Sequence, residues 1–331
     1  MKHRISTKPN IFVLTVLASI CSQAWSQNEQ KVEAPIATIN TAIGVGKAKM
    51  NLSSTQTGTK GANKQSTKTK GVILNAAVMG ATAELDMASV SGAVTGKNQQ
   101  RADVLGGVIN GAALGSSATT QIASVNGSVK GSNKQQAVIP GLVLNAAALS
   151  ARATTQIAST GGGVLVGTND QSVKSLLVIN GAGLMADATV RLASVGGSVK
   201  GHNKQVANIG AVVNAAGLMA KAEVNVASVE GSVMGSNTQR AYVGGVINGA
   251  GLGAVANVNI ASVTGSVRGV NKQTAIVGAV ANGAALGGFA EVNIATRKGS
   301  VFGGNSQTSF VGGVANFSGL GIPSVININA Y

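Results

Sequence analysis

The feature that most constrains this chain is a short pattern, an asparagine and a glutamine separated by one residue, that returns at a nearly constant interval. It occurs nine times at spacings of 34 to 36 residues, with its asparagine at Asn28, Asn63, Asn98, Asn133, Asn169, Asn203, Asn237, Asn271 and Asn305. Two further series keep this spacing: an asparagine in an apolar stretch, from Asn40 to Asn316, and an aliphatic residue, from Leu52 to Ile328. Three series with one period indicate tandem repeats of a single structural unit.

Each repeat has the alternation of an extended chain. In the stretch GSVRGVNKQTA, Val267, Asn271, Gln273 and Ala275 occupy alternate positions, and such side chains share one face of a strand. A glycine stands two positions before the asparagine in eight of the nine repeats. Because glycine inside a helix costs about 1 kcal/mol, the pattern favours strands and an all-β fold.

A repeat of this length is too short to bury its own apolar face, and stacking identical units solves that problem. We therefore predict a β-solenoid of nine tandem coils, stacked parallel and in register, as a single repeat domain over residues 27–331. Asn271, Asn282 and Asn293 lie 11 residues apart, which predicts about three faces per coil.

Buried amides need hydrogen-bond partners, and in-register stacking supplies them, because Asn lies above Asn and Gln above Gln. The alternative is that these residues only decorate surface turns, where asparagine is common, although glutamine has no such turn preference. We predict that the following residues form structural ladders: Asn63, Gln65, Asn98, Gln100, Asn133, Gln135, Asn169, Gln171, Asn203, Gln205, Asn237, Gln239, Asn271, Gln273, Asn305 and Gln307.

Basic residues recur at two positions beside this pattern, in every second repeat. They stand three residues before the asparagine or between the asparagine and the glutamine: Lys60, Lys64, Lys130, Lys134, Lys200, Lys204, Arg268 and Lys272. Coils about 4.8 Å apart would bring like charges together, and alternation doubles that separation to roughly the Debye length of about 8 Å. Duplication of a two-repeat unit would give the same pattern without a physical cause, and the two explanations are compatible. We predict that these residues form a basic stripe that binds an anionic polymer; the alternative is a solvated surface.

The first 26 residues differ from the rest. Three basic residues precede the apolar run IFVLTVLASI, and small residues follow at positions 24 and 26. This pattern predicts a secretory signal peptide over residues 1–26 and a mature chain that is extracellular or at the cell surface. The alternatives are a membrane anchor, for which the apolar run is too short, and lipidation of Cys21, which follows a bulky isoleucine.

Cleavage after residue 26 would remove the only cysteine and three of the 25 basic residues, leaving ten acidic residues and a net charge of +12. A basic excess suggests anionic partners such as polysaccharide, lipid headgroups or extracellular DNA; the alternative is that the charge only maintains solubility. The mature chain would keep one histidine, His202, and its carboxylates are scattered. We therefore predict no enzymatic activity, no cofactor and no metal site.

The signal peptide, the tandem glycine-rich repeats, and the recurring Asn and Gln among alternating Val, Ile and Ala resemble subunits of bacterial functional amyloids. Curli-type and related biofilm fibres are the most similar, although this chain has longer repeats and fewer aromatic residues. The resemblance covers residues 27–331. It implies a secreted structural protein whose β-solenoids stack into extracellular fibres, with a secretion chaperone and a nucleator as partners.

The ends of the repeat array suggest how such fibres would grow. The first repeat follows the predicted cleavage site, and the ninth stops at Tyr331 inside its last strand. We expect each chain to complete the coil of the next, so that the protein polymerises head to tail. The alternative is a monomeric solenoid adhesin or surface spacer that binds anionic polysaccharide. A minor alternative is an outer-membrane β-barrel, although a content of 2% aromatic residues is too low for the aromatic girdles of such barrels.

Overall fold

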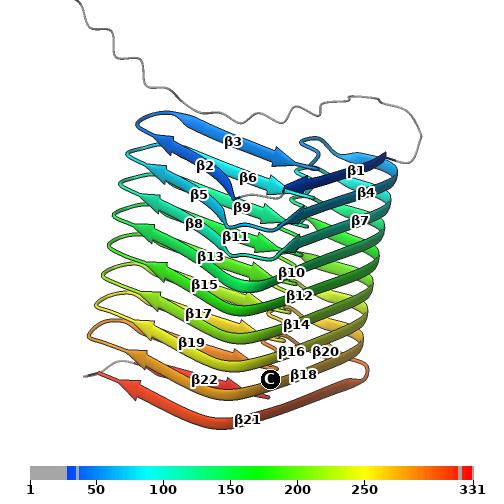
Figure 1. Ribbon diagram of the computed structural model, residues 1–331. Coiled ribbons are helices and arrows are strands. Elements are labelled where there is room, and N and C mark those ends of the chain that lie inside the picture. Colours follow the sequence, from blue (N-terminus) through cyan, green and yellow to red (C-terminus); the bar gives the residue numbers. More distant parts are fainter. Residues whose placement is uncertain (1–27, 35–36, 320–322, 330–331) are drawn as a thin grey trace, which may run out of the picture.

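In the computed structural model, residues 28–34, 37–319 and 323–329 are described, and they form a stack of nine coils built only of strands (Figure 1). Equivalent residues of neighbouring coils lie 34 to 36 positions apart in the sequence, so the predicted β-solenoid is confirmed. The predicted signal peptide, residues 1–26, lies outside the described residues. The described part of the chain contains no helix that meets the length and hydropathy required to cross a membrane.

Each coil contains three extended segments, which we call its first, second and third arms. The first arm carries the Asn-x-Gln pattern and is formed by β1 (Asn28–Ala34), β4 (Thr59–Thr69), β7 (Val94–Val104), the first halves of the long strands β10 (Val129–Ala148), β12 (Val164–Ala182), β14 (Ser198–Ala216), β16 (Val233–Ala250) and β18 (Val267–Ala284), and, in the last coil, β20 (Val301–Phe302) and the start of β21 (Asn305–Ser318).

The second arm carries the second asparagine of each repeat. In the first three coils it is a separate strand, and afterwards it is the second half of each long strand: β2 (Thr38–Ile43), β5 (Ile73–Val78), β8 (Val108–Ala113), then β10, β12, β14, β16, β18 and β21. The third arm runs back towards the start of the coil and is formed by β3 (Lys47–Leu52), β6 (Thr82–Met87), β9 (Ser117–Ile122), β11 (Arg152–Ile157), β13 (Asp187–Leu192), β15 (Lys221–Val226), β17 (Val255–Ile260), β19 (Phe289–Ile294) and β22 (Ser324–Ile328).

Every arm pairs in parallel with the same arm of the next coil, residue for residue. Asn133 in β10 is paired with Asn98 in β7 and Asn169 in β12, for example. The first and second arms share one 13-stranded sheet, and the third arms form a 9-stranded sheet. Each residue therefore repeats in a column that runs along the stack, which allows one type of side chain to stack on itself through many coils (Figure 1).

The turn after the third arm is built by an alanine and a serine. Ala158 has a φ of 47°, in the left-handed region, and the equivalent residues Ala123 and Ala193 have φ values of 50° and 48°. The hydroxyl of Ser159 donates to the carbonyl of Ile157 at 2.9 Å and to that of Arg191 in the next coil at 3.0 Å. These bonds tie the turn to its own strand and to the next coil, and so offset the cost of an unfavourable alanine conformation.

The core consists of three stripes of side chains that run along the stack, and the stripes differ in the size of their side chains. The buried side chains between the second and third arms near their shared corner are mainly alanines, such as Ala147 and Ala153. Larger aliphatic side chains, such as Ile139 and Ile157, fill the centre. A column of mainly valines closes the corner where one coil passes to the next. The inward side chains thus set the distance between the arms, because the packed interior has little room for larger groups.

Candidate functional site: amide ladders and a basic face

The predicted ladder residues lie on the inward side of the first arm. From Asn63 to Gln273 they are buried, whereas in the last coil Gln307 is partly exposed and Asn305 is exposed. Each asparagine Nδ2 donates to the Oδ1 of the next asparagine at 2.7 to 2.8 Å, and each glutamine Nε2 donates to a neighbouring glutamine Oε1 at 2.7 to 3.3 Å.

The two ladders run in opposite directions along the stack. Asn203 donates to Asn237, one coil closer to the C-terminus. Gln205, two residues later, donates to Gln171, one coil closer to the N-terminus. The same directions hold in the other coils, so each ladder has a donor end and an acceptor end, and the two are reversed.

Glutamine has a second partner that explains its presence in the pattern. Gln205 Nε2 also donates to the carbonyl of Ser228 at 3.1 Å, and Gln135 donates to that of Ser159 at 3.2 Å. These carbonyls belong to the turn after the third arm, on the far side of the core. The extra methylene of glutamine carries its amide to this turn, so the ladder also ties the first arm to the third.

The second arm contains another asparagine ladder, from Asn40 to Asn316. Asn145 Nδ2, for example, donates to Asn180 Oδ1 at 2.8 Å and to the carbonyl of Ala153 at 3.1 Å. The sequence series identified these residues only as period markers, although an asparagine repeated within an apolar stretch is itself a signal of a satisfied buried amide. A shorter ladder, which the sequence interpretation missed, occupies the third arm of the last four coils, at Asn225, Asn259, Asn293 and Asn327.

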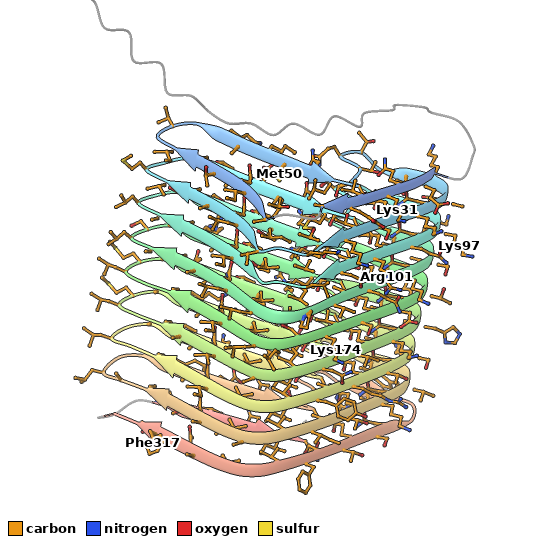
Figure 2. The ribbon with its side chains drawn as sticks, viewed as in Figure 1. Lys31, Met50, Lys97, Arg101, Lys174 and Phe317 are labelled. Atoms are coloured by element: carbon orange, nitrogen blue, oxygen red, sulfur yellow. The ribbon has the colours of Figure 1, made fainter. Side chains whose placement is uncertain are left out.

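The outward side of the first arm is strongly basic. Together with Lys70 at the corner after β4, it carries fifteen of the 22 basic residues from position 28 onward but only four of the ten acidic residues, a net charge of +11. Figure 2 shows Lys31, Lys97, Arg101 and Lys174 on this face. We call this surface the basic face.

The eight predicted basic residues form two columns of the basic face. In one, Lys130 is paired with Thr95 and Val166, and in the other Lys134 is paired with Gln99 and Asp170. No like charges are therefore adjacent in these columns. Lys64 forms an ion pair with Glu29 at 2.6 Å, and Arg268 lies 5.5 Å from the ring centre of Phe302.

The remaining charges lie on the third arm and the turn after it, and they are mostly paired. Arg191 binds Glu230 through two nitrogens, at 2.9 and 3.1 Å. Burial raises the pKa of Glu223, but a hydrogen bond from Asn225 and the charges of Lys221 and Arg191 outweigh burial and lower it overall. The third-arm surface is therefore close to neutral, and the basic face is the main source of the electrostatic field around the molecule.

One carboxylate of the third arm is not compensated in this way. Burial raises the pKa of Asp86, although Gln56 donates a hydrogen bond to it at 2.9 Å. No group of three or more His, Cys, Asp or Glu side chains in the described ranges is arranged to hold a metal ion. His202 is exposed on the basic face, in the same column as Lys97.

Comparisons of the chain with protein families, with curated proteins and with solved structures find no match.

Proposed function

We propose that this protein is a secreted structural subunit that assembles head to tail into extracellular or cell-surface fibres of the amyloid type. The observation that carries the proposal is the complementarity of the first and last described coils. These coils offer opposite halves of the same hydrogen-bond rows.

The last described coil presents asparagine nitrogens. In the coil before it, Asn282 Nδ2 donates to Asn316 Oδ1 at 3.0 Å and to the carbonyl of Val325 at 3.2 Å, both in the next coil. Asn316 Nδ2 donates to the carbonyl of Ser324 at 2.6 Å within its own coil, as Asn282 does to the carbonyl of Ala290, but among the described residues it has no further coil to donate to. Because the glutamine ladder is reversed, this end also presents the Oε1 of Gln307 as an acceptor.

The first described coil presents the opposite groups. Asn40 donates to Asn75, and Gln30 accepts from Gln65. Among the described residues, nothing donates to Asn40 Oδ1, and nothing accepts from Gln30 Nε2. A second copy placed head to tail would continue both rows, whereas a head-to-head contact would oppose donor to donor and acceptor to acceptor.

The outward charges are also compatible with a head-to-tail junction. If the register of the stack continues, Ser306 of one copy meets Glu29 of the next, Thr308 meets Lys31, and the following pair joins an aromatic ring to a glutamate. No like charges meet in these columns. The unpaired backbone groups of a terminal strand are also a general template for strand addition.

We expect the purified protein to grow into unbranched filaments with a cross-β repeat of about 4.7 to 4.8 Å. Substituting Asn316→Asp should slow growth, because a carboxylate keeps the acceptor role towards Asn282 but opposes the Asn40 oxygen of an incoming copy. Elongation from preformed seeds, followed by electron microscopy and fibre diffraction, measures both effects.

The matched control is Asn126→Asp, which makes the same chemical change at an exposed position away from both ends. It should elongate as the unmodified protein does. A chain that stays a monomer at high concentration, with no such reflection, would contradict fibre formation and favour a monomeric adhesin or spacer.

The basic face supports a second candidate function, that of a monomeric adhesin or spacer. In this function the solenoid binds an anionic polysaccharide or extracellular DNA. Neutralising Lys130, Lys134, Lys200 and Lys204 to glutamine should weaken binding of single-stranded DNA. The slope of log affinity against log salt should also become shallower, by about 0.7 for each phosphate that these lysines neutralise. Titrations at several salt concentrations test this.

A control for the basic face removes the same number of charges from the third-arm side: Lys47, Arg152, Lys221 and Lys298, each changed to glutamine. These residues form exposed ion pairs with acidic neighbours, so their loss should leave the basic face and its salt slope unchanged. Equal losses in the two variants would mean that only net charge matters and would argue against a specific basic face.

A further inference from the structure

We propose that the outward side of the second arm, with the corner that follows it, is a lateral self-association surface on which a second copy of this chain packs side by side. This contact differs from head-to-tail growth, since it joins two stacks along their length. It does not depend on fibre formation, because one stack of nine coils already presents the whole surface.

The first observation is the composition of this surface. Residues 38–46, 73–81, 108–116, 143–151, 178–186, 212–220, 246–254, 280–288 and 314–319, which form the second arm and its corner, include no charged residue. Every charge from position 28 onward lies on the first arm, at the corner after it (Lys70) or on the third-arm side. Soluble proteins rarely leave an apolar face of this extent uncovered, and such faces mark contact surfaces.

The second observation is the exposure of large apolar side chains in nearly every coil. Met185, Met219, Leu252 and Leu286 stand at the corner between the second and third arms, each more than half exposed. Leu252 and Leu286 continue a column that includes Met79, Leu114, Leu149 and Leu218, and Met185 and Met219 stand at the next position of the corner. Together these side chains form an apolar ridge along one border of the second arm.

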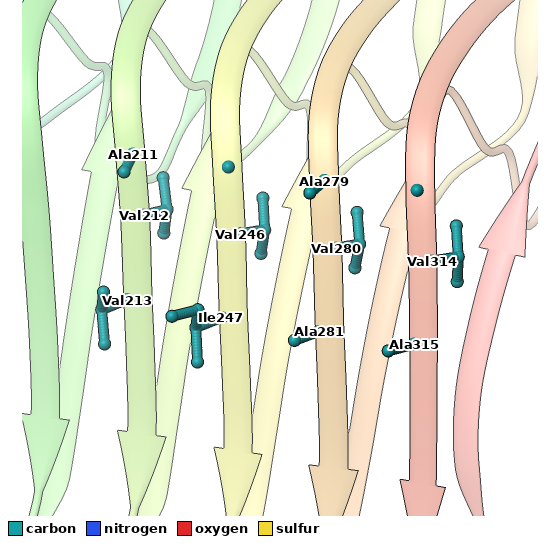
Figure 3. Close-up of a pocket in the computed structure, with 12 residues that line it drawn as sticks. Ala211, Val212, Val213, Val246, Ile247, Ala279, Val280, Ala281, Val314 and Ala315 are labelled. Atoms are coloured by element: carbon teal, nitrogen blue, oxygen red, sulfur yellow. The ribbon is translucent and has the colours of Figure 1, made fainter.

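The third observation is a shallow groove on the same surface. It crosses four coils and lies above the inward valines, between a column of Ala and Gly, such as Ala211 and Gly245, and a second column that includes Val213 and Ile247 (Figure 3). The small side chains on one side give the groove its depth. Further along the arm, another column contains only small residues from Ala76 to Gly283.

The side chains that form the ridge and the groove recur once per coil, and this period identifies the partner. Two copies of this solenoid have the same coil spacing, so the ridge of one copy stays in step with the groove of the other over the four coils that the groove crosses. A partner with a different rise would lose this match after a few coils. Dry, interdigitated contacts between identical stacked sheets use the same geometry.

The size of the surface is sufficient for a specific contact. Eight intervals of about 4.8 Å and an arm of about six residues at about 3.3 Å each give roughly 750 Å² per copy. A stable protein interface buries about 800 Å² per partner. Since no charge lies on this surface, pairing also desolvates no charged side chain.

The test compares two substitutions of isoleucine by lysine. Ile247 is 57% exposed on the second arm, and Ile276 is 42% exposed on the basic face. Analytical ultracentrifugation in the Asn316→Asp background, in which filament growth is slowed, should show paired particles without a further change and with Ile276→Lys, and single particles with Ile247→Lys. Circular dichroism should show the same strand content in all three.

Pairing should strengthen in sulfate, because excluded salts favour apolar burial, and electron microscopy of filaments should show double-width particles only where pairing persists. Persistent pairing in Ile247→Lys, or single particles for the unmodified protein at every concentration, would overturn the proposal. The surface would be assigned to lipid instead if the unmodified protein formed single particles in solution but bound phosphatidylcholine vesicles, and if Ile247→Lys abolished that binding. Asn316→Asp should leave side-by-side pairing intact, so failure of head-to-tail growth is distinguishable from failure of this contact.

Discussion

Replacing Gly201 with alanine is expected to destabilise the solenoid by at least about 3 kcal/mol. Gly201 has a φ of 124°, a region that side-chain-bearing residues rarely adopt at a cost of about 1 to 3 kcal/mol. A Cβ there would also overlap the backbone carbonyl of Gly167 in the preceding coil. Chemical denaturation followed by circular dichroism measures the loss.

Gly181→Ala is the matched control. Gly181 lies on the second arm, and a Cβ added to it would meet no atom within 4 Å. Its substitution should leave stability unchanged or raise it slightly, because alanine restricts the unfolded chain. If Gly201→Ala proved as stable as Gly181→Ala and the unmodified protein, the first-arm glycine column would not require glycine.

Replacing Asn203 and Gln205 together with leucine should break one rung of both ladders. The bonds from Asn169 and to Asn237 disappear, as do those to Gln171 and from Gln239, together with the bond to the Ser228 carbonyl. Each buried group left without a partner costs about 1 to 3 kcal/mol, so the loss should reach several kcal/mol.

Thermal and chemical unfolding measure this loss, and Lys204→Leu is the control. Lys204 lies between the two amides, is exposed and points outward, so its substitution leaves the ladders intact. If the double variant unfolds at the same temperature as the unmodified protein, the amides contribute no net stability and the ladders are decorative.

The number of coils and the pairing register were predictable from sequence, because a stacked repeat converts sequence period directly into spatial neighbours. Once Asn133 is placed beside Asn98 and Asn169, the other positions of the first arm follow, and the second series of asparagines fixes the second arm in the same way. The ladder residues were predictable for the same reason, since one residue type at one position must meet itself in the next coil.

Other features were not predictable, because they depend on geometry that residue identity does not encode. The direction in which each ladder donates depends on the rotation of the side-chain amide groups, which the residue type does not determine. The Asn-Gln pattern predicted Gly269 as an ordinary strand position, whereas its φ of 120° shows a local bend. The left-handed turn at Ala158 has no sequence signal, because alanine is not a residue that favours that conformation.

The first and last described coils lie at opposite ends of the stack, and this placement determines how the protein responds to tension (Figure 1). A force that pulls the two ends apart acts along the hydrogen bonds between coils and loads the outermost coil first. Coils then peel away one at a time, since each contacts mainly its neighbours. A released coil of 34 to 36 residues adds roughly 115 Å of extended chain in place of a rise of about 4.8 Å. The solenoid would therefore lengthen in steps and dissipate work at each one, as a molecular shock absorber does.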